Sequence, residues 1–113
     1  MRTSIRLRFL GTGDSGKTNC PTLYATDRGT YVVQGWKTGA PGTVEIPHML
    51  LGYLENQTFI DTALVDSGRG TFTLTGRPID DAPTLEQMTF QPNETAIEVP
   101  MKGRSYFGGV PAE

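Results

Sequence analysis

The sequence predicts a mainly β domain: a small antiparallel barrel or sandwich with an internal pseudo-twofold repeat of β-hairpin units and one or two short helices. Two observations concern the repeat. Residues 28–35 (RGTYVVQG) have an echo in residues 69–76 (RGTFTLTG), and residues 44–47 (VEIP) have one in residues 97–100 (IEVP), in the same order. The third is composition, because 14 Gly, 8 Pro and only 36% hydrophobic residues favour short strands joined by many turns.

Regular structure is expected to begin at residues 5–10. Ile5, Leu7 and Phe9 alternate there with Arg6 and Arg8, and a period of two is typical of a half-buried strand. A polar, glycine-rich loop follows over residues 11–19.

The first repeat unit, about residues 20–54, opens with a predicted hairpin. Strands at 22–26 and 30–34 are joined by the turn 27–29, in which Gly29 takes the left-handed conformation. Pairing across this turn sets Thr26 opposite Thr30 and Leu23 opposite Val33. The face expected in the core carries Leu23, Ala25, Tyr31 and Val33. The face expected to meet solvent or a partner carries Thr22, Tyr24, Thr26, Thr30, Val32 and Gln34. A loop at 35–42, a strand at 43–46 and a helix at 48–54, begun by Pro47, complete this unit.

The second unit, about residues 58–102, repeats the plan. A strand at 58–65, a turn at 66–70 and a strand at 71–75 put Phe72 and Leu74 in the inward places of Tyr31 and Val33. An insertion relative to the first unit includes a predicted short helix at 82–88, with Asp80 or Asp81 near its N-cap. Residues 103–113 are expected to form a tail that frays at its end. The whole chain, residues 1–113, is expected to form a single domain.

Bulk properties limit the function classes. The net charge is −2, so no broad electrostatic attraction to nucleic acid or an anionic membrane is expected. Cys20 is the only cysteine, so no internal disulfide is expected. The first residues contain no continuous apolar region, so no signal peptide is expected. No apolar run approaches the ~18 residues of a membrane span. These features predict a cytoplasmic protein without membrane association.

A phosphate-loop pattern occurs at residues 11–18 (GTGDSGKT). In nucleotide-binding proteins its amides cradle phosphates, its lysine reaches the β/γ oxygens and its threonine holds magnesium. The corresponding residues here are Gly11, Gly16, Lys17 and Thr18. The motif needs a helix to start at its end, whereas Pro21 and a β pattern follow. Nucleotide binding is therefore an alternative hypothesis, and a polar loop is the favoured interpretation.

Catalytic and metal constellations are scarce. His48 is the only histidine and Cys20 the only cysteine, so no set of zinc ligands is available. A catalytic triad would have to use His48 alone. No catalytic residue, metal or cofactor is predicted. Arg28 and Arg69 fall at the two hairpin tips, where solvated charges are expected.

The outward threonine-rich faces of the hairpins are the favoured partner surface. Trp36, just past the first hairpin, is a natural anchor for such a surface, and a buried plug at the end of the sheet is the alternative for it. An ordinary solvated strand face is the alternative for the threonines. The predicted partner-binding residues are Tyr24, Thr30, Gln34, Trp36, Thr71, Thr73 and Thr75.

Residues 20–36 (CPTLYATDRGTYVVQGW) resemble a family of short, uncharacterised actinobacterial proteins encoded close to helix-turn-helix regulators. The part from Gly76 through residues 95–101 (TAIEVPM) is similar to the later part of the same pattern, whereas the segment between Gly35 and Thr43 is shorter. The resemblance implies a regulatory setting and no catalytic residues. The expected function is thus a non-catalytic protein-interaction module, with a helix-turn-helix regulator as the candidate partner. Nucleotide binding and self-association through sheet edges are the alternatives.

Overall fold

The computed structural model describes residues 5–13, 21–103, 105–106 and 110–111, and confirms a mainly β, antiparallel fold with two short helices. The main sheet runs in the order β1-β2-β3-β4-β7-β6, with β9 paired to β3, β5 and β8. Its order does not close into a complete barrel. The strands are β1 (Leu7–Thr12), β2 (Thr22–Thr26), β3 (Thr30–Lys37), β4 (Thr43–Pro47), β5 (Thr58–Ile60), β6 (Val65–Asp66), β7 (Thr71–Thr75), β8 (Arg77–Pro78) and β9 (Glu94–Gly103), followed by a separate pair, β10 (Ser105–Tyr106) and β11 (Val110–Pro111). The helices are the 3₁₀-helix η1 (His48–Tyr53) and the α-helix α1 (Ala82–Leu85).

The first hairpin has the predicted register. Leu23 lies opposite Val33 and Ala25 opposite Tyr31. Gly29 has φ 75°, the left-handed conformation that the three-residue turn requires. The turn and the alternation are both local, which is why the sequence was sufficient to predict this element.

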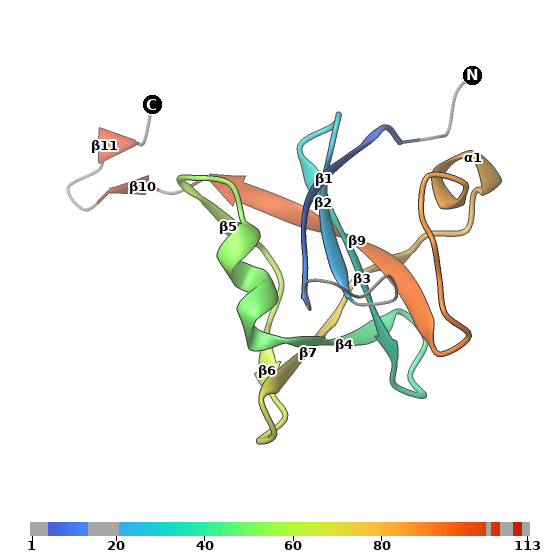
Figure 1. Ribbon diagram of the computed structural model, residues 1–113. Helices are drawn as coiled ribbons and strands as arrows, with labels where there is room; N and C mark the ends of the chain where they lie inside the picture. Colours follow the sequence, from blue (N-terminus) through green and yellow to red (C-terminus); the bar gives the residue numbers. More distant parts are fainter. Residues whose placement is uncertain (1–4, 14–20, 104, 107–109, 112–113) are drawn as a thin grey trace.

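Strand β3 is the centre of the molecule, because it pairs with β2 on one edge and with β9 on the other (Figure 1). Its residues Tyr31, Val32 and Val33 are fully buried although they point alternately to opposite faces. One hydrophobic cluster therefore lies on each side of β3. The larger joins the inward residues of β2, β3 and β9 to Val44, Ile46, Leu74 and Leu50 of η1; the smaller contains Ile5, Val32, Ile79 and Ala96.

The expectation that Thr22, Val32 and Gln34 meet solvent is wrong. Their exposed fractions are 8%, 0% and 2%. The cause is the insertion in the second unit, whose Leu85 and later residues pack over this face of the first hairpin. Figure 1 shows α1 and η1 on opposite sides of the central strands.

The single strand predicted at residues 58–65 is also wrong. Its first part, β5, pairs with the far end of β9, where Thr58 lies opposite Gly103. Only Val65 and Asp66, which form β6, pair with β7. The long strand β9 offers β5 a free edge, so the second hairpin is much shorter than the first.

Both predicted helices are present, and each is placed by local sequence. Helix η1 follows Pro47 and buries Leu50 against the larger cluster. Helix α1 is shorter than predicted, and Asp81 is its N-cap, accepting a hydrogen bond from the Thr84 amide at 3.1 Å. The Thr84 hydroxyl in turn accepts from the Ile5 amide at 2.9 Å, which ties the start of the described chain to this helix.

The strand registers run crosswise between the two predicted units. In β3, Thr30 lies opposite Pro100 and Val32 opposite Glu98 of β9. In β7, Thr71 lies opposite Pro47 and Thr73 opposite Glu45 of β4. Each segment that begins with Arg-Gly-Thr thus pairs with the Glu-containing strand of the other unit, at the same offset.

Two glycines allow further close contacts of equivalent kind. A Cβ atom added at Gly35 would lie 2.7 Å from the carbonyl oxygen of Glu45, and one added at Gly76 would lie 2.5 Å from that of Glu98. A side chain at either position would force neighbouring backbone apart.

Candidate functional site

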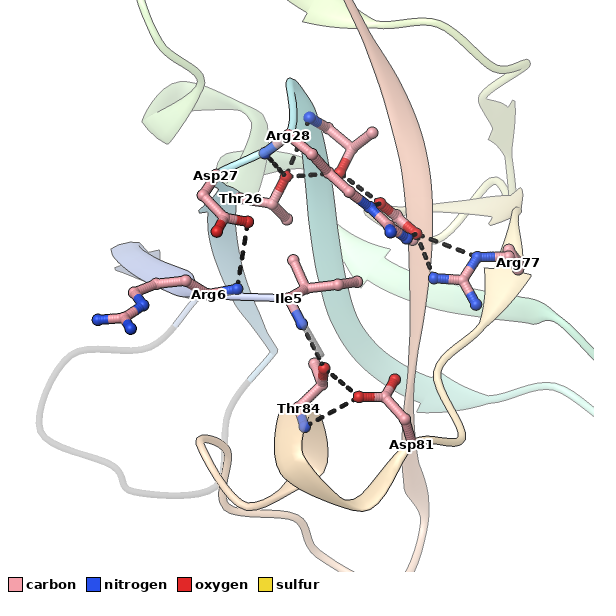
Figure 2. Close-up of polar contacts among 10 residues, drawn as sticks. Ile5, Arg6, Thr26, Asp27, Arg28, Arg77, Asp81 and Thr84 are labelled. Carbon is pink, nitrogen blue, oxygen red and sulfur yellow. Dashed lines mark hydrogen bonds and ion pairs between the residues drawn. The ribbon is translucent and has the colours of Figure 1, made fainter. Parts of the chain in front are cut away.

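Glu98 of β9 is the acceptor of a dense polar cluster. Its side chain is 6% exposed, and Arg28 donates to it from Nε at 2.8 Å and from Nη2 at 2.6 Å. The Thr30 hydroxyl donates at 2.6 Å and Arg77 Nε at 3.0 Å. Figure 2 shows the Arg28 and Arg77 side chains converging on one carboxylate from different segments. We call these four residues the Glu98 cluster.

The Glu98 cluster stabilises a buried negative charge. Burial alone raises the pKa of the Glu98 carboxyl, but the hydrogen bonds from Arg28, Thr30 and Arg77 outweigh burial and lower the pKa from 4.5 to about 2. Because donors surround the carboxylate, it has little capacity left for a ligand. The cluster therefore fastens the turn before β3, and the start of β8, to the last long strand.

A second cluster of the same residue types surrounds Glu45 of β4. Arg69 Nη2 donates to it at 2.9 Å, and the Thr71 hydroxyl donates as well. The hydrogen bond from Thr71, aided by Arg69, lowers the pKa of the Glu45 carboxyl despite some burial. Arg28 and Arg69 lie at the two hairpin tips with 48% and 67% of their side chains exposed, as expected, but each also forms an ion pair with a glutamate, which was not predicted. The matched Arg-Gly-Thr and Glu-containing segments were the sequence signal for these pairs.

A polar recess lies at the other end of the same sheet face. It has a volume of about 330 Å³, and the described residues that line it carry no formal charge. They come from β1, β2, β3 and the segment after α1: Phe9, Thr12, Thr22, Tyr24, Gln34, Gln87 and Thr89. We call this site the Tyr24 recess. It brings together two of the residues predicted to bind a partner, Tyr24 and Gln34.

Two aromatic rings form one wall of the Tyr24 recess. Phe9 and Tyr24 pack edge to face, with ring centroids 6.3 Å apart. Phe9 is 60% exposed, the largest value among the exposed large hydrophobic residues of the described chain. The rim of the recess is therefore aromatic and open to contact from outside.

A buried carboxylate lies behind the recess. Glu94 is 4% exposed, and its Oε1 accepts from Gln34 Nε2 at 2.9 Å and from the Gln91 amide at 3.1 Å. Its Oε2 is buried without a hydrogen-bond partner among the described residues. Burial, and then the negative charge of Glu94, raise the pKa of the Tyr24 hydroxyl, so the field of this carboxylate extends to the recess wall.

The other predicted partner-binding residues lie elsewhere. Thr30 belongs to the Glu98 cluster. Trp36 is half-buried and lies opposite Glu94 and Glu45. The β7 threonines, Thr71, Thr73 and Thr75, pair with β4 and not with the first hairpin. The threonine-rich surface expected from the sequence is thus divided between two groups of strands.

The phosphate-loop pattern begins within a strand. Gly11 belongs to β1 and lies against the Tyr53 ring. A Cβ atom added at Gly11 would lie 2.2 Å from the nearest carbon of that ring. The Gly13 amide donates to the Pro21 carbonyl at 2.7 Å, just before the antiparallel strand β2. Gly16, Lys17 and Thr18 lie outside the described residues. An antiparallel return after so few residues differs from the helical crossover to a parallel strand that a phosphate-loop fold uses.

His48 is half-exposed at the start of η1. Its Nε2 lies 3.1 Å from the Thr71 carbonyl oxygen, and its ring packs at a tilt against the Phe72 ring, with ring centroids 4.1 Å apart. These contacts attach η1 to β7.

Within the described part of the chain, no three His, Cys, Asp or Glu side chains are grouped so that they could hold a metal ion. None of the helices that the structure describes is long and apolar enough to cross a membrane.

Comparison of the chain with protein-family models, with curated protein sequences and with solved structures found no match.

Proposed function

We propose that the protein is a non-catalytic, cytoplasmic interaction module that binds another protein at the Tyr24 recess. One observation carries the proposal: an exposed aromatic residue, Phe9, stands beside a recess that Tyr24 and Gln34 line. Protein interfaces concentrate their binding energy in a few aromatic anchors next to shaped, partly polar pockets. A transcriptional regulator of the helix-turn-helix class is the candidate partner, from the resemblance to proteins encoded near such regulators.

A pull-down with matched variants tests this function. Tagged protein is incubated with nuclease-treated lysate of the source cells, and retained proteins are identified by mass spectrometry. Phe9→Ala is expected to lower the amount of the specific partner retained by at least tenfold, because it removes an interface anchor. Phe59→Ala is the control, because Phe59 is also exposed, at 40%, but lies on β5 away from the recess. If both variants retain the partner equally, or if neither variant retains it, the assignment of this surface is overturned.

The internal pseudo-twofold repeat remains a proposal about how the module is built. It is supported by equal registers, by equivalent close contacts at Gly35 and Gly76, and by two Arg–Thr–Glu clusters that each join one unit to the other. A double-mutant cycle on Arg28 and Glu98, and one on Arg69 and Glu45, should give coupling of the same sign. Coupling in only one of the two cycles contradicts equivalent roles.

A further inference from the structure

The Tyr24 recess has an electrostatic character that none of its lining residues explains. Its described walls are uncharged, yet a buried carboxylate, Glu94, lies directly behind Gln34. A carboxylate in a poorly hydrated interior keeps a strong field, because little water screens it. Gln34, the hydrogen-bond partner of Glu94, is itself one of the residues that line the recess.

Glu94 is incompletely satisfied in the described protein. Two donors, Gln34 and Gln91, serve Oε1, whereas Oε2 has none among the described residues. A buried polar atom without a hydrogen-bond partner is costly, and such an atom in a folded protein calls for an explanation. A positive charge arriving in front of Gln34 would compensate it.

The walls of the recess suit a cation. Gln34 Nε2 already donates to Glu94 and to the Thr89 carbonyl at 2.6 Å, so the remaining polar atom of this amide is its oxygen, an acceptor. The faces of Phe9 and Tyr24 attract cations through their ring quadrupoles. The hydroxyl groups of Thr12 and Thr22 also line the recess, and a hydroxyl oxygen can accept a hydrogen bond. Acceptors, aromatic faces and a rear carboxylate together match an ammonium or guanidinium group.

We propose that the Tyr24 recess receives a basic side chain, of arginine or lysine, presented by the partner protein. This inference rests on the proposed function, since it names the chemistry by which the same surface recognises its partner. The cation stacks against the aromatic rim, donates hydrogen bonds to the Gln34 oxygen and the threonine hydroxyls, and is attracted by Glu94 from behind. A neutral side chain of equal shape lacks this attraction.

The recess can be probed directly with small amides in the full-length protein. Nα-acetyl-arginine amide and Nα-acetyl-lysine amide are titrated into ¹⁵N-labelled protein, and Nα-acetyl-citrulline amide is the neutral match for the first. Amide shifts are expected at Tyr24, Gln34 and Thr89, with the basic probes binding roughly tenfold more tightly than the neutral one. The stronger of the two basic probes identifies guanidinium or ammonium as the preferred group. Equal binding of the citrulline probe, shifts confined to other strands, or no shifts at millimolar probe overturn the inference.

Variants separate the two contributions to recognition. Glu94→Gln keeps the shape of the side chain and removes its charge, so binding of the basic probes should fall roughly tenfold. Phe9→Ala should weaken all three probes, and Phe59→Ala should change none. Because Glu94 is buried, each variant is first checked for native chemical-shift dispersion. If Glu94→Gln is unfolded, the salt dependence of probe binding replaces it, since affinity for a charged ligand falls as salt rises; affinity that is independent of salt overturns the inference.

Failure of this inference is distinguishable from failure of the proposed function. If Phe9→Ala releases a specific partner but no basic probe binds, the surface binds protein by another chemistry. If neither the probes nor a partner depends on Phe9, the interaction function at this surface fails as well.

Discussion

Replacing Glu98 with glutamine tests how much the Glu98 cluster stabilises the fold. The pKa of its carboxyl is 4.5 in an ordinary environment and about 2 in the folded protein. Each unit of pKa difference corresponds to about 1.4 kcal/mol, which gives roughly 3 kcal/mol. Arg28 and Arg77 are 48% and 50% exposed, so solvent screens part of this interaction. We therefore expect Glu98→Gln to lower the free energy of unfolding at pH 7 by about 2 kcal/mol.

The pH dependence gives the sharper result. A carboxyl whose pKa is lower in the folded state contributes its full stabilisation above the unfolded pKa of 4.5, and loses it as the pH falls toward about 2. The difference between the original protein and Glu98→Gln should therefore be constant above about pH 5 and shrink progressively as the pH falls below it.

Urea unfolding followed by the fluorescence of Trp36, the single tryptophan, measures this difference at each pH. Glu86→Gln is the matched control, because Glu86 is exposed after α1, and this change should alter stability by less than about 0.5 kcal/mol. The reasoning is refuted if the Glu98 and Glu86 variants are equally stable at pH 7, or if the loss in Glu98→Gln does not change with pH.

Three further substitutions probe close packing, helix capping and the core, each measured by the same unfolding assay. Gly76→Ala should lower the free energy of unfolding by about 1–3 kcal/mol, because its methyl group would lie 2.5 Å from the Glu98 carbonyl oxygen. Gly52→Ala in η1, with open space around it, should be neutral or stabilising by up to about 1 kcal/mol, and the same change in both variants would contradict the close approach at Gly76. Asp81→Ala should cost about 1–2 kcal/mol through loss of the α1 N-cap, and Asp81→Asn much less, so equal losses would argue against capping. Leu50→Ala should cost about 2–5 kcal/mol because Leu50 is fully buried, while Met49→Ala, at a 51% exposed position, should stay within about 0.5 kcal/mol; a comparable loss in both would contradict the orientation of η1.

Features that depend on neighbouring residues could be predicted from the sequence. The register of the first hairpin follows from a glycine turn and alternating side chains, and the cap of α1 follows from an acidic residue before a proline-containing turn. Burial of the second face of β3 could not be predicted in this way. Val32 is buried by Leu85 and Ile79, which lie about fifty residues further along the chain, and no periodicity reports such contacts.

The polar sites show the same limit. The repeated Arg-Gly-Thr and Glu segments were visible in the sequence. The contact between Arg28 and Glu98, 70 residues away, was not. The Tyr24 recess contains two predicted residues, whereas Glu94 behind it gave no signal, because its place depends on a side-chain hydrogen bond to Gln34, 60 residues earlier. Charge and exposure at a site arise from such long-range contacts, so residue type alone was a poor guide to them.

The crosswise pairing of strands has a consequence for how the protein is made. During synthesis, the first hairpin emerges from the ribosome long before its neighbour β9, whose Glu98 is 68 residues from Thr30. Strand β3 then exposes the hydrogen-bonding edge that β9 will later pair, and apolar side chains such as Val32 that later segments will bury. Folding around β3 therefore has to wait for β9, and loop closure over this length makes it slow. A nascent chain of this kind is most vulnerable to aggregation and proteolysis just before its last long strand is released.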